Sequence, residues 1–286
     1  HLSKTQLKNM AKILILAPSG FGKSTGIGPS AELGIEGLDP KESYIISVTS
    51  KALPFRGSEK LFPSAKSKGV PVKIEDLRGT SRFISNDAKR IAEVLALLKT
   101  NPRIKTIVID DTNYIMQDYY MDNALKTGWD APKKVGYDMG VIFKALEGLE
   151  DRNIIVMGHY QMKPLAADES RVEYTLKTTG KMVDEYLTPG GKFDICLIGK
   201  TGMETGENNI KKVVKFYVTN DDGETAGAKS APGMFPPTII NDLGLVVKKV
   251  NEYYAGEAPV VQSDVASEQV TPVTPVILSE EPGPLA

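Results

Sequence analysis

A short apolar run followed by a glycine-rich loop stands near the start of the chain, in KILILAPSGFGKST at residues 12–25. Residues 13–16 are apolar without interruption, which is typical of a buried strand. The loop matches the spacing Gly-x-x-x-x-Gly-Lys-Ser/Thr, with Ala17 in the place of the first glycine. Because such a loop joins a strand to a helix, this segment constrains the fold more than any other and predicts an α/β sheet.

The residue types of this loop suit a polyphosphate. The two glycines of GFG allow the backbone to turn successive N–H groups inward, which makes an anion site. Lys23 is expected to reach the outer phosphates of ATP, and the Ser24 hydroxyl to bind Mg²⁺. The predicted nucleotide-binding residues are Ser19, Gly20, Phe21, Gly22, Lys23, Ser24 and Thr25. Gly26, Gly28 and Pro29 predict that the following helix is short or distorted.

A second candidate segment is TIVIDD, at residues 106–111. An apolar strand that ends in a carboxylate places that acid at the carboxyl edge of a parallel sheet, where the phosphate loop also opens. Asp110 is therefore expected to bind Mg²⁺, and Asp111 to orient an attacking water. The alternative is a strand followed by an aspartate-rich turn without a ligand.

The third segment, IIVMGHYQ at residues 154–161, is another apolar strand with polar residues at its end. His159 and Gln161 are candidates for contact with the γ-phosphate, where they would respond to hydrolysis. A lone histidine is also a common structural residue, so both interpretations of His159 remain open.

Alternating apolar runs and helical patterns predict a mainly parallel sheet with helices on both faces. Strands are expected at 43–48, 70–75, 105–111 and 153–158, with helices at 86–99 and near 136–149. Glycine-rich turns separate three further expected strands, at 171–177, 193–199 and 211–219. We expect these three to be antiparallel additions to the same sheet.

Composition indicates a cytoplasmic enzyme. The 286 residues are 41% hydrophobic and include one cysteine, Cys196, which cannot form an internal disulfide. No apolar run approaches the roughly 18 residues that cross a membrane, so no membrane partner is expected. The chain carries a net charge of −1, and residues 251–286 hold six acidic and no basic residues, so residues 1–250 carry +5. We expect residues 1–10 to be an extension, 11–257 an ATPase domain, and 258–286 a disordered acidic tail.

The order of these segments resembles the RecA-type P-loop ATPase core, and more closely the phage-encoded RecA-like proteins that include single-strand annealing proteins. KALPFRG at 51–57 and KSAPGMFPPTIINDLG at 229–244 are also similar to those phage proteins, and the resemblance covers roughly residues 11–250. It implies a RecA-like NTPase core with antiparallel C-terminal strands, located in the host cytoplasm. It also implies Mg²⁺-dependent ATP hydrolysis by a homo-oligomer that acts on single-stranded DNA in recombination, annealing or replication.

The same resemblance implies roles for two further regions and shows one departure. Residues 160–180 would be a mobile loop that faces DNA, and Lys229 would reach the nucleotide of a neighbouring subunit. RecA-type cores carry a catalytic glutamate after the second strand, whereas this strand ends Val-Thr-Ser-Lys at 48–51. Either Asp111 supplies the base, or hydrolysis is slow and nucleotide binding is the main event.

DNA contact is also suggested by aromatic and basic residues between 114 and 137. Aromatic rings stack on bases and lysines follow the backbone of single-stranded DNA. The relevant residues are Tyr119, Tyr120, Trp129, Tyr137, Lys126, Lys133 and Lys134. The same tyrosines equally suit helix packing. Two other function classes share the ATP site: a small-molecule phosphotransferase, and a packaging or helicase motor.

Overall fold

The structure is a computed structural model that describes residues 10–65, 71–123, 130–179, 183, 189–205 and 211–257. Within these residues, nine strands form one sheet in the order β11-β10-β9-β1-β6-β5-β2-β4-β3, and two more form a hairpin. The strands of the sheet are β1 (Lys12–Leu16), β2 (Ser43–Ser47), β3 (Ser64–Ala65), β4 (Arg82–Ile84), β5 (Thr106–Asp110), β6 (Asn153–Gly158), β9 (Ile195–Thr205), β10 (Lys211–Val218) and β11 (Thr238–Ile240).

The seven strands from β9 to β3 run parallel to one another. Beyond β9, β10 pairs antiparallel with β9, and β11 pairs antiparallel with β10. The expected strands at 43–48, 105–111, 153–158 and 211–219 are confirmed as β2, β5, β6 and β10. The segment expected at 193–199 is a strand too, but β9 pairs in parallel with β1 and so belongs to the parallel set. The molecule is therefore α/β, with a large, mostly parallel sheet.

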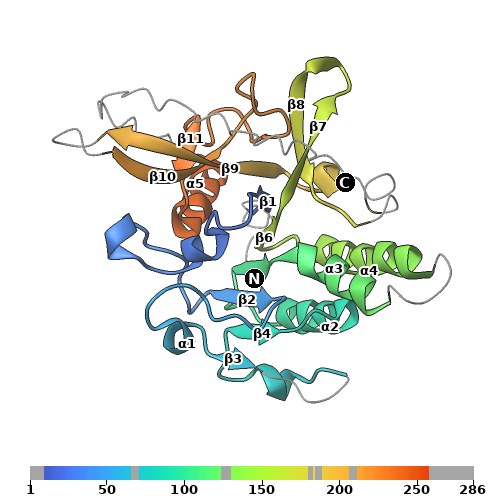
Figure 1. Cartoon of the computed structure of the whole chain (residues 1–286). Coiled ribbons are helices and arrows are strands. Elements are labelled where there is room, and N and C mark those ends of the chain that lie inside the picture. Colours follow the sequence, from blue (N-terminus) through green and yellow to red (C-terminus); the bar gives the residue numbers. More distant parts are fainter. Residues whose placement is uncertain are drawn as a thin grey trace, which may run out of the picture.

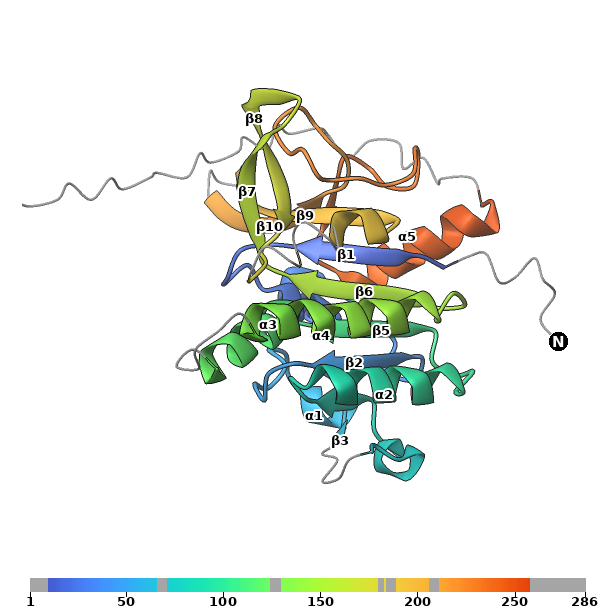
Figure 2. The ribbon, with the colours of Figure 1, turned by 90° about the vertical axis from the view of Figure 1, so that its right-hand side faces the viewer.

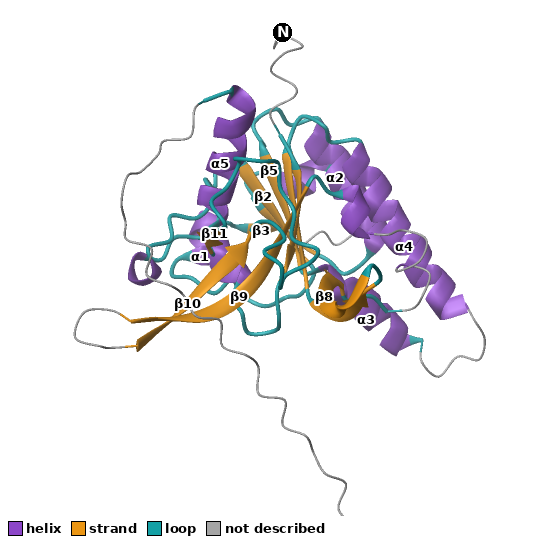
Figure 3. Ribbon diagram, turned by 90° about the horizontal axis from the view of Figure 1, so that it is seen from above, coloured by secondary structure: helices purple, strands orange, loops and turns teal. Residues whose placement is uncertain are grey.

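Helices cover both faces of this sheet (Figure 3). The helices α2 (Ala88–Lys99), α3 (Thr112–Asp122) and α4 (Asp130–Glu147) lie on one face, and α5 (Leu243–Ala255) lies on the other. A short helix, α1 (Ser58–Leu61), lies near the β3 edge (Figure 1). Each face has its own apolar layer, which buries alternate residues of the same central strands.

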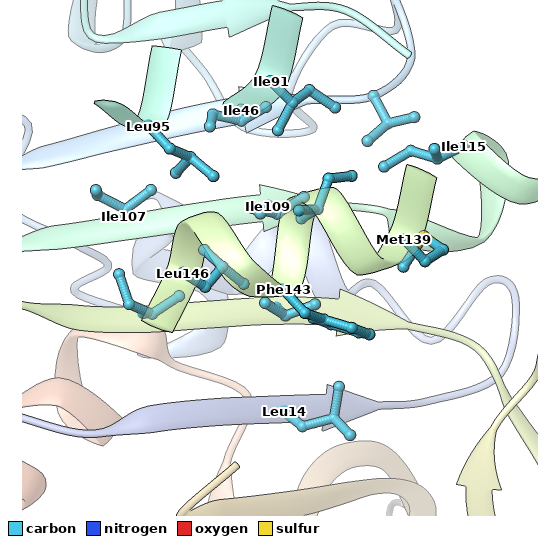
Figure 4. Packing of buried hydrophobic residues seen from close by; sticks show 14 of the residues in the cluster. Leu14, Ile46, Ile91, Leu95, Ile107, Ile109, Ile115, Met139, Phe143 and Leu146 are labelled. Carbon is cyan, nitrogen blue, oxygen red and sulfur yellow. The ribbon is translucent and has the colours of Figure 1, made fainter. Parts of the chain in front are cut away.

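Apolar side chains of α2 and α4 pack against the sheet, as the helical spacing of apolar residues in the sequence predicts (Figure 4). Ile91 and Leu95 are one turn apart on α2, and both are fully buried against the sheet. Phe143 and Leu146 do the same from α4. The Asp87 carboxylate accepts hydrogen bonds from the backbone N–H groups of residues 89 and 90, which fixes the start of α2 two residues after the expected start.

The expected strand at 70–75 is wrong in its described part. A 3-10 helix, Ile74–Leu77, occupies this segment, and Asp76 accepts a hydrogen bond from the Lys73 N–H at its start. The apolar alternation was misleading because Val72 is buried whereas Ile74 is 40% exposed. The next position in the sheet is taken instead by β4.

The segment expected at 171–177 is also a strand, but it is not an addition to the main sheet. β7 (Tyr160–Leu165) and β8 (Asp168–Leu176) pair with each other as an antiparallel hairpin. The hairpin projects beyond the sheet edge at which β1 and β6 end (Figure 2). This hairpin coincides with most of the loop that the RecA resemblance assigns to DNA.

Among the described residues, none of the helices has the length and apolarity to traverse a bilayer. The expected acidic tail and residues 1–9 lie outside the described residues.

Candidate functional site

The three candidate segments meet at one edge of the sheet. β1, β5 and β6 are parallel, so the phosphate loop, Asp110 and His159 all follow carboxyl ends of strands. β6 lies between β1 and β5, although it follows β5 in the chain (Figure 2). This order brings His159 between the phosphate loop and the two aspartates.

The phosphate loop has the backbone conformation that its glycines predict. Gly20 and Gly22 have φ angles of 77° and 88°, which are strained for any residue with a side chain. The backbone N–H groups of Gly22, Lys23 and Ser24 donate no hydrogen bond to the described part of the chain. They are therefore available to an anion.

The helix after the loop is a single 3-10 helix, Lys23–Ile27, as short as the sequence predicts. Gly26 lets this helix pack closely against Asn241, because a Cβ atom at that position would lie only 2.6 Å from the Asn241 side-chain oxygen. Backbone N–H groups, rather than the dipole of a long helix, thus provide the positive potential here.

Asp110 lies at the end of β5 and contacts the loop directly. The Ser24 hydroxyl donates a hydrogen bond of 2.8 Å to Asp110 Oδ2. Burial raises the pKa of Asp110 to about 6, although the Ser24 hydrogen bond opposes this shift, and the nearby Asp111 charge adds to it. The pair predicted to bind Mg²⁺ is therefore assembled before any ligand binds.

Asp111 contacts two other predicted site residues, Lys23 and His159. Its Oδ2 lies 3.2 Å from Lys23 Nζ and 3.0 Å from His159 Nε2. Lys23 and Asp111 are both almost fully buried, and Lys23 also donates to the Ala17 carbonyl at 3.2 Å. Lys23 is thus held by protein groups that a phosphate can replace.

A cleft of about 320 Å³ contains this cluster. Ser19, Gly20, Gly22 and Thr25 line it, in addition to Lys23, Ser24, Asp110, Asp111 and His159. Phe21 differs: its ring is 2% exposed and packs at 5.5 Å from Tyr217. Phe21 therefore holds the loop against the core instead of facing the cleft.

The opposite wall of the cleft carries cations that the sequence analysis missed. Arg82 on β4 is buried and donates to the Ser47 hydroxyl at 2.8 Å, to the Glu59 carboxylate at 3.0 Å and to the Lys51 carbonyl. Lys51 Nζ lies 5.5 Å from the centre of the Tyr114 ring. Lys51 lines the cleft where the resemblance would place a glutamate, so the described wall after β2 is basic.

Two residues from the far end of the chain fasten the phosphate loop. Asn241 donates to the Gly22 carbonyl at 2.7 Å, and its side-chain oxygen accepts from the buried Tyr217 hydroxyl. Lys215 on β10 donates to the Gly20 carbonyl at 3.1 Å. These contacts span about two hundred positions, and no local sequence pattern indicates them.

Asn113 connects the site to the β7–β8 hairpin. Its backbone N–H donates to Asp111 Oδ1 at 3.0 Å, while its side chain accepts from the His159 N–H and donates to the Lys177 carbonyl, each at 2.6 Å. Residues 159 and 177 flank the two strands of the hairpin. One side chain therefore ties both ends of the hairpin to the strand-end aspartate.

Two predicted site residues lie elsewhere. The Gln161 amide donates to the Leu176 carbonyl across the hairpin, at 3.3 Å. Lys229 is exposed and forms an isolated β-bridge with Cys196. Neither residue lines the cleft of this single chain.

In the proposed aromatic platform, Lys134 lies over the rings of Tyr119 and Tyr137 and pairs with Asp138. Tyr120 and Tyr137 are exposed, 41% and 66% respectively. The expected contributions of Lys126 and Trp129 lie outside the described residues.

The residues around Ser24 and Asp110 fit a magnesium ion that is shared with phosphates. Mg²⁺ in such sites takes one or two protein oxygen ligands and completes its shell with phosphate and water. Within the described residues, no group of three or more His, Cys, Asp or Glu side chains could hold a metal by itself.

No protein-family model matches the chain, and no curated protein matches it either.

Proposed function

We propose that this chain binds and hydrolyses Mg²⁺-ATP through a RecA-like P-loop core, and that it uses this activity on single-stranded DNA. One observation carries the proposal: Lys23, Ser24, Asp110, Asp111 and His159, from three separate segments, meet in one cleft beneath free loop N–H groups. The sheet order, with β6 between the loop strand and the acidic strand, supports a core of this type.

ATP would bind with its outer phosphates against the loop. The N–H groups of residues 22–24 would donate to phosphate oxygens, and Lys23 would exchange its contact with Asp111 for the β- and γ-phosphates. Ser24 and Asp110 would hold Mg²⁺, which neutralises charge on the phosphate oxygens when bound. Lys51, on the facing wall, adds a positive charge near the same phosphates.

Release of Lys23 would leave Asp111 in contact with His159 and with the Asn113 N–H. The Asp111 carboxylate can then accept a proton from an attacking water or orient it, while the hydrogen bond from the Asn113 N–H and the contact with His159 Nε2, each at 3.0 Å, position the carboxylate. Asp111 is our candidate base because Lys51, and not a glutamate, follows β2. Because Asp111 also pairs with Lys23, it is available to the attacking water for only part of the time, and we expect slow hydrolysis.

The proposed action on DNA rests on the hairpin that begins beside His159. Asn113 ties both of its ends to Asp111, so contacts that change at the nucleotide can reach the hairpin. The described hairpin has no excess of basic residues: Arg171 pairs with Asp221, and residues 168 and 169 are acidic. DNA affinity would therefore depend on an assembly of several chains rather than on one strongly basic surface.

The alternative function, phosphoryl transfer to a small molecule, lacks support from the arginines. Enzymes of that kind close a basic lid over the transferred phosphate. Arg152 instead donates to backbone carbonyls at the ends of α2 and its following loop, and Arg171 is bound to Asp221. Neither is free to form a lid.

ATP hydrolysis by the purified chain, measured with and without single-stranded DNA, tests the proposal. We expect Mg²⁺-dependent turnover that single-stranded DNA stimulates, and that Lys23→Ala abolishes. Turnover by Lys23→Ala at the rate of the unaltered protein would overturn the assignment of the ATP site. Phosphate transfer to an added small acceptor in place of water would favour the phosphotransferase.

A further inference from the structure

A second, smaller cleft of about 250 Å³ lies beside the phosphate loop. Thr25 lines both clefts, so the two lie on either side of this residue at the end of the loop. Lys23 and Asp111 mark where the outer phosphates would lie. The inner end of a nucleoside triphosphate would therefore extend past Thr25 towards this second cleft.

The second cleft is lined mainly by apolar residues, together with Lys212, Lys215, Thr25 and Asn241. Leu33, Val213 and Ile240 are 53%, 53% and 45% exposed, and all three line it. Large apolar side chains that gather in one exposed hollow are a feature of ligand sites. No acidic side chain is among the described residues that line this cleft.

One wall is also a strand edge that no described strand pairs with. The Lys215 carbonyl accepts a hydrogen bond from the Asn241 N–H, and the Thr219 N–H donates to the Pro237 carbonyl. Residues 215 and 219 show that the odd-numbered residues of β10 direct their backbone groups towards β11. Backbone groups alternate along a strand, which directs the N–H and C=O of Val213 to the same side. β11 ends at Ile240, before it can pair with Val213.

We propose that this second cleft binds the base of the nucleotide and that it selects adenine. The inference rests on the proposed function, because it assumes that the loop binds a nucleoside triphosphate. The apolar side chains would enclose the faces of a planar ring. The Val213 N–H and C=O would pair with the ring nitrogen and the neighbouring amino group that adenine presents along one edge.

Guanine fits this cleft less well. It presents two N–H donors side by side, and the cleft offers one backbone carbonyl at Val213 and no lining carboxylate to receive them. The Asn241 amide already donates to the Gly22 carbonyl and accepts from the Tyr217 hydroxyl, which fixes its orientation.

The test is calorimetric titration of the whole chain with Mg²⁺-tripolyphosphate, Mg²⁺-ATP and Mg²⁺-GTP. The uncharged double variant Leu33→Ser/Val213→Ser should bind ATP about tenfold more weakly and tripolyphosphate within about twofold of the unaltered protein. Val213→Pro, which removes one N–H at a strand edge, should lose the preference for ATP over GTP. The matched control Met162→Ser/Val172→Ser changes two exposed apolar residues of the hairpin and should bind all three ligands normally.

Each other outcome counts against the base site. If the unaltered protein binds ATP and tripolyphosphate equally well, or if the double variant loses neither, the second cleft does not bind the base although the phosphate site stands. Equal loss of both ligands, with a fall in assembly mass, would show that the apolar surface lies between copies of the chain. If the unaltered protein binds none of the ligands, the proposed function fails, and the base site fails with it.

Discussion

Replacement of Asp110 by asparagine should stabilise the protein in the absence of nucleotide while it weakens Mg²⁺-ATP binding. Burial raises the pKa of this carboxyl from 3.8 to about 6, because the charged form loses hydration beside Asp111. A raised pKa in the folded state means that ionisation at neutral pH opposes folding. At about 1.4 kcal/mol per pKa unit, the full shift corresponds to about 3 kcal/mol at pH 7. Asp110 is partly open to the cleft, so we expect a gain of about 1–2 kcal/mol.

Urea unfolding of the Asp110→Asn variant and the unaltered protein, without Mg²⁺, measures this gain. The sign of its pH dependence follows from the same shift. Between pH 6 and pH 4 the carboxyl of the folded protein is protonated while that of the unfolded chain is still mostly ionised, so the gain should shrink as the pH falls and vanish below pH 3.8. Mg²⁺-ATP affinity of the unaltered protein should fall below pH 6, since a protonated Asp110 is a poor ligand.

Asp111→Asn is the matched control, with the same change one residue away. Asp111 pairs with buried Lys23 and with His159, so its loss should cost about 1–3 kcal/mol. It should also spare Mg²⁺-ATP binding and reduce hydrolysis. An Asp110→Asn variant that is less stable than the unaltered protein at pH 7 would refute the reasoning, because Asp110 would then be stabilised and not strained by its surroundings.

Three further predictions concern the loop, the assembly and the tail. Lys23→Ala should fold normally by circular dichroism yet lose ATP binding in calorimetry, because its charge serves the phosphates; unchanged affinity would contradict this. A mixture of Lys23→Ala and Lys229→Ala subunits should regain ATPase activity above either alone, if Lys229 acts on a neighbour's nucleotide; co-assembly without recovery argues against action between subunits. Truncation before Ala258 removes four of six C-terminal acids and should tighten single-stranded DNA binding, most at low salt. Equal affinity of the truncated and full chains across a salt series would exclude a competing tail.

The central strands and the phosphate loop were predictable because their signals are local. Four apolar residues before a glycine-rich loop, or three before a pair of aspartates, identify a buried parallel strand and the edge where it ends. The same logic placed His159 in the site. The pairing of Asp111 with both Lys23 and His159 could not be predicted, since it depends on the order of strands in the sheet.

Other features escaped because their causes are not local. Because a strand was expected at 70–75, β4 was not predicted. Arg82 on β4, whose side chain forms part of the cleft wall, was therefore missed as a site residue. Lys215 and Asn241 reach the loop only because β10 and β11 extend the sheet beside it. The role of Gln161 was predicted from its position at a strand end, and that of Lys229 from a resemblance; a single chain leaves both open, and these roles stay predictions.

The position of Asn113 gives the hairpin the properties of a lever arm. β7 has six residues, and at about 3.3 Å per residue its tip lies about 20 Å from this pivot. A rotation of about 5° at the pivot would displace the tip by about 2 Å, roughly the difference between a hydrogen bond and a broken contact. Arg171 and Tyr174 of β8 are bound to residues 221–226, so a small change at Asp111 would be multiplied along the hairpin only where these contacts move with it.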